Sequence, residues 1–398
     1  MAGRKLRIAI VGGGIGGLSA ALALLQAGFD VEVYEQASAL GEIGAGIQIS
    51  PNASRLLYRL GLAEALAPAA VRPVAGHQRR WQDGRTLQRS PMGEAIEAAF
   101  GAPYFHFHRA DLLRALSGAL PPERLHLRHR LERLVDHGDQ VEAQFGNGAR
   151  ITADLLVGAD GIHSAVRAAL FGAEHPQFTG CIAYRGLVSA ERLAHLELET
   201  TANNWLGPGR HFVHYFVAGR RLLNFVAVIE RETWTGESWT DRGRVADALA
   251  AYDGWHPQVG AIIGAVDETF IWALFDRAPL PRWSVGRVTL LGDACHAMLP
   301  FMAQGAAQSI EDGAALAASL TRHADDVVAA LRLYETIRQP RASRLQALSR
   351  VNKTRFHLPD GPAQEARDAE LAVRGDRSIP AIGWLYAHDA ARLEAAEG

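Results

Sequence analysis

The chain has 398 residues, with 41 Lys or Arg and 43 Asp or Glu, so its formal net charge is −2. A chain of this length is expected to form two domains around a large core, and its nearly balanced charge excludes a general attraction to nucleic acid or to an anionic membrane. Its two cysteines, Cys181 and Cys295, are far apart, which fits the reducing cytoplasm. With no recognisable secretion signal or spanning segment, we expect a cytoplasmic protein without a membrane partner. None of its 16 histidines lies in an HxxxH or HExxH pattern, so we predict no metal site.

Residues 8–36 predict a strand, a glycine turn, a helix and a parallel strand. The apolar run IAIV is followed by GGGIGG, by small and apolar residues at helical spacing, and by VEVYEQ. In the GxGxxG register, Gly12 permits the tight turn, Gly14 lets the backbone approach a pyrophosphate, and Gly17 lets the helix pack on the strand. Gly16 completes the glycine cluster, which would place phosphates at the positive end of the helix. A membrane span is the alternative, but the glycines would break it.

An acidic residue ends the second strand. Glu35 follows the glycine turn by roughly twenty residues, where a carboxylate can accept hydrogen bonds from both hydroxyls of an adenosine ribose. The preference for an unmodified 2′-hydroxyl favours FAD or NAD over NADP. Gln36, the next residue, is assigned to the same dinucleotide site.

The rest of the chain divides into segments of helical and of β pattern. The first half predicts a strand and a helix begun by Ser50, Pro51 and Asn52, β structure over 74–87, a loop and an amphipathic helix from His106, strands over 125–158, and a helix after Asp160. The second half predicts a mostly β region from Thr179 to Trp272, then strand, loop and helix, a helical stretch over 323–356 with a break at Pro340, and a tail that is helical in patches.

Three stretches together identify a family resemblance. These are GGGIGG with Glu35, GADGIHSAVR over 158–167, and LLGDACHAMLPFMAQGAAQSIED over 290–312. They resemble the class A flavoprotein monooxygenases, the single-component FAD-dependent aromatic hydroxylases, most closely the salicylate hydroxylases, 3-hydroxybenzoate 6-hydroxylase and 6-hydroxynicotinate 3-monooxygenase. The resemblance covers nearly the whole chain. It is specific for the family and much less so for the substrate.

The resemblance implies an α/β fold with discontinuous domains. We predict a Rossmann-like FAD-binding domain of residues 1–73, 100–178 and 273–350, an inserted, mainly antiparallel β substrate domain of residues 74–99 and 179–272, and a helical C-terminal region of residues 351–398. The implied reaction uses NADH or NADPH and O₂ to hydroxylate a phenolic aromatic acid, salicylate-like or 3-hydroxybenzoate-like, through a C4a-hydroperoxyflavin. A homodimer is also expected.

The same resemblance assigns further cofactor-binding residues. Asp293 of the GD motif would hold the ribityl chain of FAD, although it could instead cap a helix. Asp160 of the DG motif would serve FAD and the path of NAD(P)H. Arg109 would contact the phosphates or the ring edge, although it could be an ordinary exposed arginine. A helix beginning near Gly305 and Ala306 would direct backbone N–H groups at the flavin. Leu131 and Gln48 complete the assigned set.

The strand HFVHYFV supplies the candidate catalytic residue. Alternation places His211, Val213 and Tyr215 on one face of the strand. An electrophilic oxygen needs an electron-rich ring, and a phenol becomes electron-rich when a base takes its proton. We therefore predict that His211 accepts or orients the phenolic proton and that Tyr215 binds the substrate. The alternative for His211 is a histidine that is half-buried in a sheet.

Two positions bear on the choice of substrate. The resemblance implies that the 6-hydroxynicotinate enzymes have a histidine at each of the positions of Gln48 and Phe301. Both residues are assigned to substrate binding. Gln48 cannot be a general base, and Phe301 makes its wall apolar, so a carbocyclic hydroxybenzoate or a less polar phenol is favoured over a hydroxypyridine carboxylate. Another heteroaromatic or bicyclic phenol stays an alternative substrate. Arg185 is the candidate for the residue that binds the substrate carboxylate.

Other functional classes share parts of this pattern. An FAD-dependent dehydrogenase or oxidase would share the glycine turn, but the GADG and GDACH motifs and the PFMAQG loop argue against it. A non-catalytic flavin-binding sensor is a third possibility. The sequence contains no second GxGxxG unit, so NADH and NADPH cannot be distinguished from the motifs.

Overall fold

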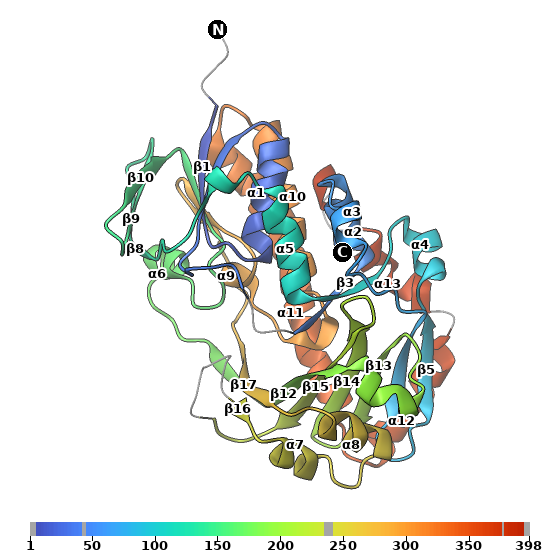
Figure 1. Cartoon of the computed structure of the whole chain (residues 1–398). Coiled ribbons are helices and arrows are strands. Elements are labelled where there is room, and N and C mark those ends of the chain that lie inside the picture. The colour runs from blue at the N-terminus through green and yellow to red at the C-terminus, as the bar shows by residue number, and fades with distance from the viewer. Residues whose placement is uncertain (1–4, 42–44, 235–241, 376–377, 394–398) are drawn as a thin grey trace.

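The computed structural model describes residues 5–41, 45–234, 242–375 and 378–393. Figure 1 shows two bodies, an upper one built on the sheet that contains the first strand and a lower one built on a larger sheet. Across the described residues, no helix combines the length and the apolar character that a membrane span requires. The predicted α/β fold class is confirmed.

The N-terminal sheet forms the core of the first body. In the described part of the chain its strands are, in spatial order, β18 (Ser284–Val285), β19 (Val288–Leu290), β11 (Leu155–Gly158), β1 (Arg7–Val11), β2 (Asp30–Tyr34) and β7 (Leu125–His126). From β19 to β7 neighbouring strands are parallel. The central strands are nearly all apolar, as expected for parallel strands covered on both faces.

Helices surround this sheet and the space between the two bodies. They are α1 (Ile15–Gln26), α2 (Pro51–Arg59), α3 (Ala63–Leu66), α4 (Glu94–Phe100), α5 (Arg109–Ala119), α6 (Ala165–Phe171), α9 (Asp293–His296), α10 (Gly305–Arg322) and α11 (Val327–Phe356). Helices α1 and α10 approach closely because both carry small residues: a Cβ on Gly313 of α10 would lie 2.8 Å from the Cα of Ala20.

Two small sheets complete the first body. One contains β10 (Arg150–Ala153), β9 (Val141–Phe145) and β8 (Leu131–Asp136), and the other pairs β3 (Gly46–Ile49) with β6 (Phe105–His108). The second pairing corrects the expectation of a loop at His106. FHFH is too short for its alternation to be distinguished from a loop by pattern alone, and it is extended because it pairs with β3.

The large sheet forms the core of the second body. Its described strands are, in spatial order, β16 (Arg242–Gly243), β17 (Thr269–Asp276), β12 (Gln177–Ser189), β15 (Leu222–Glu230), β14 (Arg210–Val217), β13 (Thr201–Gly207), β4 (Ala75–Arg80) and β5 (Thr86–Pro91). All neighbours are antiparallel except β13 and β4. Helices α7 (Val245–Ala251) and α8 (Pro257–Gly264) cover the outer face in Figure 1.

Helix α11 connects the two bodies. Tyr334, near its start, donates a hydrogen bond to the Leu290 carbonyl of the N-terminal sheet, and Lys353, near its end, donates to the Thr179 carbonyl of β12. The predicted break at Pro340 is wrong, because the helix is continuous from Val327 to Phe356. A proline removes the hydrogen bond to the carbonyl four residues earlier, here that of Thr336. Both residues are exposed, so water can serve this carbonyl.

The C-terminal region is helical, with α12 (Pro362–Arg374) and α13 (Ser378–Tyr386). Short 3-10 helices lie at Pro122–Arg124, Ala190–Leu196, Pro300–Met302 and Ala390–Arg392. The predicted domain limits stay a prediction. Strands β12 and β17 extend across the limits at 178 and 272, and α11 extends across the limit at 350.

Candidate functional site

The carboxyl ends of four parallel strands meet at one edge of the N-terminal sheet. Val11 of β1 pairs with Tyr34 of β2 and with Gly158 of β11, and Gly158 pairs with Leu290 of β19. The residues that follow these ends therefore leave the sheet at the same edge, where ligands of open α/β sheets bind. The glycine turn, Glu35, Asp160 and Asp293 all follow such an end.

The glycine turn has the geometry of a phosphate-binding loop. Gly12 has a φ of +113°, and a Cβ there would lie 2.3 Å from the Ala159 carbonyl oxygen. A Cβ on Gly17 would lie 1.9 Å from the Gly12 oxygen, so the turn and helix α1 can close only around glycines. A Cβ on Gly14 would meet nothing within 4 Å. Gly14 therefore faces open space, as a position approached by a ligand should.

Gly16 has a different environment. A Cβ there would lie 2.8 Å from a methyl carbon of Leu291 and 3.0 Å from the Cβ of Ser309. Gly16 thus permits the close packing of α1 against the segment before α9 and against α10. Its predicted role in binding the cofactor would act through this packing and the backbone.

Glu35 is held by backbone amides. Its two carboxylate oxygens accept hydrogen bonds from the N–H groups of Gly13 (2.6 Å) and Ala37 (2.8 Å). Each oxygen keeps a second lone pair, which a ribose hydroxyl can use. Gln36 is exposed beside it. Leu131 is 8% exposed at the start of β8. It lies two residues after His129, whose N–H donates a hydrogen bond to the Glu35 carbonyl.

Asp293 and the start of α10 form the other end of this edge. Asp293 is exposed, although Ala294, which follows it in the short helix α9, is buried. Gly305 and Ala306 begin the 18-residue helix α10 and are partly exposed. The first amides of a helix have no partners within it, so this end presents N–H groups and the positive end of the helix dipole to a ligand.

Asp160 has a structural role at the same edge. Its carboxylate accepts hydrogen bonds from the Ser164 hydroxyl and from the N–H groups of Ala165 (2.8 Å) and Val166 (3.1 Å), at the start of α6. Burial raises the pKa of Asp160, and these hydrogen bonds lower it in part. The side chain is therefore directed at α6, and any contact with the cofactor would be additional to this one. Arg109 begins α5, and its N–H bonds the Ala45 carbonyl beside β3.

A fully buried ionic network lies behind the start of α10. Arg338 of α11 donates to Asp312 Oδ1 (2.8 Å) and to Glu311 Oε2 (2.5 Å), and Arg341 donates to both oxygens of Glu311. The other Asp312 oxygen bonds His296 Nε2 at 2.6 Å. Nearby arginines hold the pKa of Glu311 below its ordinary value against the effect of burial. Sequence reasoning missed this network, whose partners lie 16 to 30 residues apart.

The predicted substrate residues lie on the inner face of the large sheet. Along β14, Phe212 packs against Phe225 and Tyr252 on the side of α7 and α8. His211 and Tyr215 point to the opposite side, with Val213 between them. Four residues of strand span about 13 Å, so these two side chains stand at the two ends of one strip of the sheet.

One end of this strip is aromatic and apolar around His211. The His211 ring is 2% exposed and meets the rings of Phe301 and Phe356 edge-on, at centroid distances of 4.9 and 5.3 Å. Burial lowers the pKa of His211 well below its ordinary value, and His357 lowers it further. The imidazole is therefore neutral near pH 7, which is the state that accepts a proton.

The other end carries hydroxyl and amide groups. Tyr104 donates to Gln48 Oε1 at 2.6 Å, and Tyr215 lies with its ring centroid 4.4 Å from that of His106. Burial raises the pKa values of Tyr104 and Tyr215, so both keep their hydroxyl protons and can donate. A hydrogen bond with Gln48 lowers the pKa of Tyr215 in part, so the structure brings Gln48 to Tyr215 and Phe301 to His211, as two separate pairs.

Arg185 lies on the same face, between these two ends. It pairs with Val226 of β15, which pairs with Val213 of β14, and directly opposed residues of antiparallel strands share a face. Its guanidinium carbon lies 3.3 Å from the ring centroid of Trp272. The register therefore places the cationic Arg185 level with Val213, in the middle row of the strip between His211 and Tyr215.

Sequence reasoning missed two residues that are connected to His211, one directly and one through the first. Nδ1 of His211 lies 2.7 Å from Nε2 of His357, and Nδ1 of His357 lies 2.9 Å from Oε1 of Glu230. The separations of 146 and 127 residues leave no local signal. Cys181 also lies near His357 and Glu230, and Cys295 lies near His296 and Asp312. The absence of a metal site stays a prediction.

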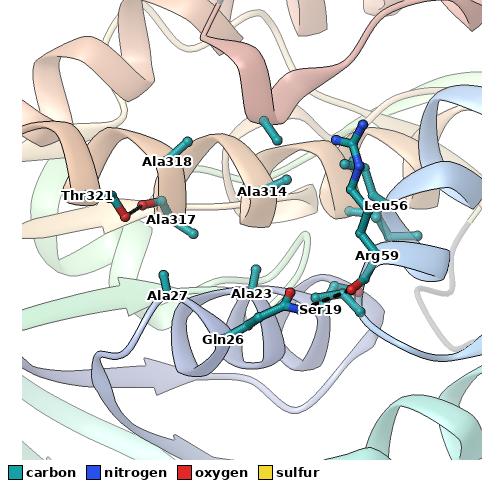
Figure 2. A pocket seen from close by; sticks show the side chains of 13 residues that line it. Ser19, Ala23, Gln26, Ala27, Leu56, Arg59, Ala314, Ala317, Ala318 and Thr321 are labelled. Atoms are coloured by element: carbon teal, nitrogen blue, oxygen red, sulfur yellow. Dashed lines mark hydrogen bonds between the residues drawn. The ribbon is translucent and has the colours of Figure 1, made fainter.

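Two surface cavities lie away from these residues. One of about 250 Å³ lies between α1, α2 and α10, where Ala23, Ala27, Ala314 and Ala317 face one another in Figure 2. Another of about 500 Å³ lies between α5 and the residues after α2. None of the predicted site residues lines either cavity, and the site is therefore defined by the sheet edge and the strip described above.

Comparison with known proteins agrees with this arrangement. The sequence model of an FAD-binding domain matches residues 5–349. The chain is 44% identical over 385 residues to a 3-amino-4-hydroxybenzoate 2-monooxygenase of Streptomyces platensis, covering 97% of this chain and 96% of the relative. It is 40% identical over 351 residues to a 6-hydroxynicotinate 3-monooxygenase of Bordetella bronchiseptica, covering 87% and 91%. The crystal structure of Klebsiella pneumoniae HpxO with FAD and uric acid is similar with a TM-score of 0.86 and 29% identity, covering 95% of each chain.

Proposed function

We propose that this chain, which belongs to the FAD-binding-domain family, hydroxylates 3-amino-4-hydroxybenzoate at C2. Its reaction class is that of an FAD-dependent monooxygenase of hydroxylated aromatic acids. The observation that carries the proposal is the similarity, over nearly the whole chain, to an enzyme named for that reaction. The apolar contact between Phe301 and His211 supports a carbocyclic ring at this site. The sequence-based prediction of the reaction class is confirmed, and its salicylate-like or 3-hydroxybenzoate-like substrates are the competing candidates.

The residues of the sheet edge fit FAD. Gly14 leaves open space for a diphosphate, Glu35 keeps lone pairs for a ribose, and Asp293 is exposed for a polyol chain. The start of α10 presents N–H groups to the ring system. When bound, FAD accepts a hydride from NADH or NADPH and activates O₂ for transfer of one oxygen atom to the substrate.

His211 would act on the group that activates the ring. In 3-amino-4-hydroxybenzoate, C2 is next to the carbon that carries the amine and meta to the hydroxyl, so the amine lone pair makes C2 electron-rich. A neutral imidazole that accepts a hydrogen bond from this amine increases the donation and can take the N–H proton as the new C–O bond forms. In a hydroxybenzoate the imidazole lone pair of His211 would accept the phenolic proton.

The remaining residues of the strip orient the substrate. Arg185, in the middle row, would pair with the substrate carboxylate, because a guanidinium matches a carboxylate with two parallel hydrogen bonds. Tyr215 and Gln48 would bind the polar edge farther along. Phe301 and Phe356 beside His211 exclude water, which protects the reactive oxygen species from unproductive decay.

The test uses the purified protein loaded with FAD. Consumption of NADH and of NADPH is measured with 3-amino-4-hydroxybenzoate, 4-hydroxybenzoate, salicylate, 3-hydroxybenzoate and 6-hydroxynicotinate, and the products are identified by mass with ¹⁸O₂. We expect labelled oxygen at C2 of 3-amino-4-hydroxybenzoate with little peroxide. Peroxide without labelled product would mark that compound as an effector, and coupled hydroxylation of another acid alone would contradict the proposed substrate.

The nicotinamide and the assembly are part of the same proposal. The chain would use NADH or NADPH without a separate nucleotide domain, because the sequence has one GxGxxG unit. The homodimer stays a prediction, which light scattering of the purified protein tests.

A further inference from the structure

A chain of three side chains leads from the substrate strip to the protein surface. His211 on β14 is 2% exposed, the His357 side chain just after α11 is also 2% exposed, and the Glu230 side chain at the end of β15 is 45% exposed. The two links measure 2.7 Å from His211 Nδ1 to His357 Nε2 and 2.9 Å from His357 Nδ1 to Glu230 Oε1. Buried imidazoles are thus connected to a carboxylate that water reaches.

The backbone fixes these three residues relative to one another. The N–H of Gly209 donates to the His357 carbonyl at 3.0 Å, and the N–H of Glu230 donates to the Gly209 carbonyl at 2.8 Å. Gly209 therefore connects the end of α11 to the paired ends of β14 and β15. The alignment of the side chains is part of the fold and does not depend on a flexible loop.

The hydrogen-bond partners determine which nitrogen carries each proton. An ionised Glu230 can only accept, so Nδ1 of His357 carries a hydrogen and Nε2 of a neutral His357 is an acceptor. Nδ1 of His211 must then carry the hydrogen that it shares with His357. Nε2 of His211 is left with a lone pair, on the ring that meets Phe301 and Phe356. Glu230 thus sets the tautomer of a residue two links away.

We propose that Glu230 and His357 are positioning residues that keep His211 in its basic tautomer and form a proton relay between the substrate and bulk water. The inference rests on the proposed function for the role of His211. When Nε2 of His211 takes a proton from the substrate, its Nδ1 proton passes to Nε2 of His357, and the Nδ1 proton of His357 passes to Glu230 and then to water. One N–H or O–H bond breaks and one forms at each step. The same path in reverse returns a proton to the product and restores the tautomers.

The charged and titratable groups around the relay come from four elements. Lys353 lies on α11 and Arg210 on β14, and both lower the pKa of His357, whose main depression comes from burial. Glu230 on β15 raises it in part. Cys181 on β12 is also near, and burial raises its pKa to about 11, so it stays a neutral thiol. Both histidines are therefore neutral at rest, and each can receive a proton.

The first experiment reads the tautomers directly. The full-length FAD-loaded protein, labelled with ¹⁵N at histidine, is examined by long-range ¹H–¹⁵N correlation without substrate, and His211→Asn assigns the His211 signals. We expect His211 protonated at Nδ1 and His357 protonated at Nδ1. His211 protonated at Nε2 would overturn the inference, and this readout does not depend on which aromatic acid is the substrate.

The second experiment measures proton movement with 3-amino-4-hydroxybenzoate. His357→Gln keeps an acceptor for the His211 Nδ1 proton but cannot relay it, and Glu230→Gln removes the terminal carboxylate. Both are expected to lower kcat about tenfold with KM nearly unchanged and to increase the solvent isotope effect. Exposed Glu232→Gln, two residues from Glu230, is the charge-matched control and should behave as the wild type.

The outcomes separate the relay from the proposed function. If the wild type hydroxylates no aromatic acid, the function is wrong, while the tautomers still test the positioning role. If hydroxylation is normal and Glu230→Gln matches Glu232→Gln in kcat and solvent isotope effect, the relay is wrong. An increase in KM alone would indicate a merely structural role and would also overturn it.

Discussion

The two halves of the site handle charge in opposite ways. Around the edge of the N-terminal sheet, charges are kept and paired: Glu35 is bonded by amides, and Arg338 is bonded to Glu311 and Asp312. On the strip of the large sheet, burial keeps titratable groups such as His211 neutral. The first half is suited to hold a cofactor that carries charge, and the second to accept and pass protons.

The difference follows from the partners that each half can offer. Backbone amides and the start of a helix provide fixed dipoles for anions without any titration. A proton acceptor must be free of such pairing, because a nearby opposite charge fixes its protonation state. The ionic network behind α10 is therefore expected to govern stability and the relay at His211 to govern turnover.

The largest expected effect is the loss of the buried guanidinium at Arg338. Arg338→Leu leaves Glu311 and Asp312 without this partner at positions that are 0% exposed. Removing one member of a buried ion pair costs about 3–5 kcal/mol, which urea denaturation of the wild type and the variant measures. Exposed Arg332→Leu on the same helix is the control and should change stability little. Equal stabilities of the two variants would contradict the role of the network.

The next effect concerns turnover. His211→Ala removes the proposed base, so we expect kcat to fall about a hundredfold and more NADH to be consumed per product formed. His214→Phe changes a buried histidine of the same strand on the opposite face, beside Trp205, and should keep the coupling of the wild type. Full coupling in His211→Ala would show that this residue has no catalytic role.

The acid dependence of stability separates the histidines that burial keeps neutral from the carboxylates of the ionic network. Burial lowers the pKa of His106 to about 3 and the pKa of His214 to about 3. The unfolded chain takes up these protons below about pH 6.5 and the folded chain does not, so stability is lost as the pH falls, by about 1.4 kcal/mol per unit for each histidine. Glu311 and Asp312, whose pKa values are lowered, contribute stability that is lost only below their ordinary range.

Urea denaturation at several values between pH 7 and pH 5 tests this order. His214→Phe should lose stability less steeply than the wild type, by the share of one histidine. A loss of stability that begins only below pH 4.5 would assign acid sensitivity to the carboxylates and contradict the prediction.

The sequence predicts the half of the site that is built by local patterns. The turn from Gly12 to Gly17, the start of α10 at Gly305 and the alternation along β14 each depend on a few adjacent residues, and the structure has each of them. The class of reaction and the cofactor were predicted from motifs of the same kind and are confirmed. The roles of individual site residues stay predictions.

The rest could not be predicted because it depends on distant partners. His357 meets His211, and Glu230 meets His357, only after α11 has crossed from one sheet to the other. Asp160 is a local exception: its carboxylate bonds the start of α6, four to six residues along the chain, and its predicted contact with the cofactor stays a prediction. Pro340 lies inside α11, where it and Thr336, whose carbonyl loses its helical partner, are both exposed residues. Pattern and propensity do not describe such tertiary effects.

The smallest expected effect tests the half built from backbone, at Gly14. A Cβ there meets nothing within 4 Å, and the backbone φ of −75° suits any residue, so Gly14→Ala should unfold at the wild-type temperature without FAD. A methyl group in the space reserved for the diphosphate should weaken FAD binding at least about tenfold, or 1.4 kcal/mol, measured by titration of the apoprotein. Gly118→Ala, exposed on α5, should bind FAD as the wild type does. Gly12→Ala, strained at its φ of +113°, should lose both stability and FAD binding. Normal FAD binding by Gly14→Ala would show that the diphosphate lies elsewhere.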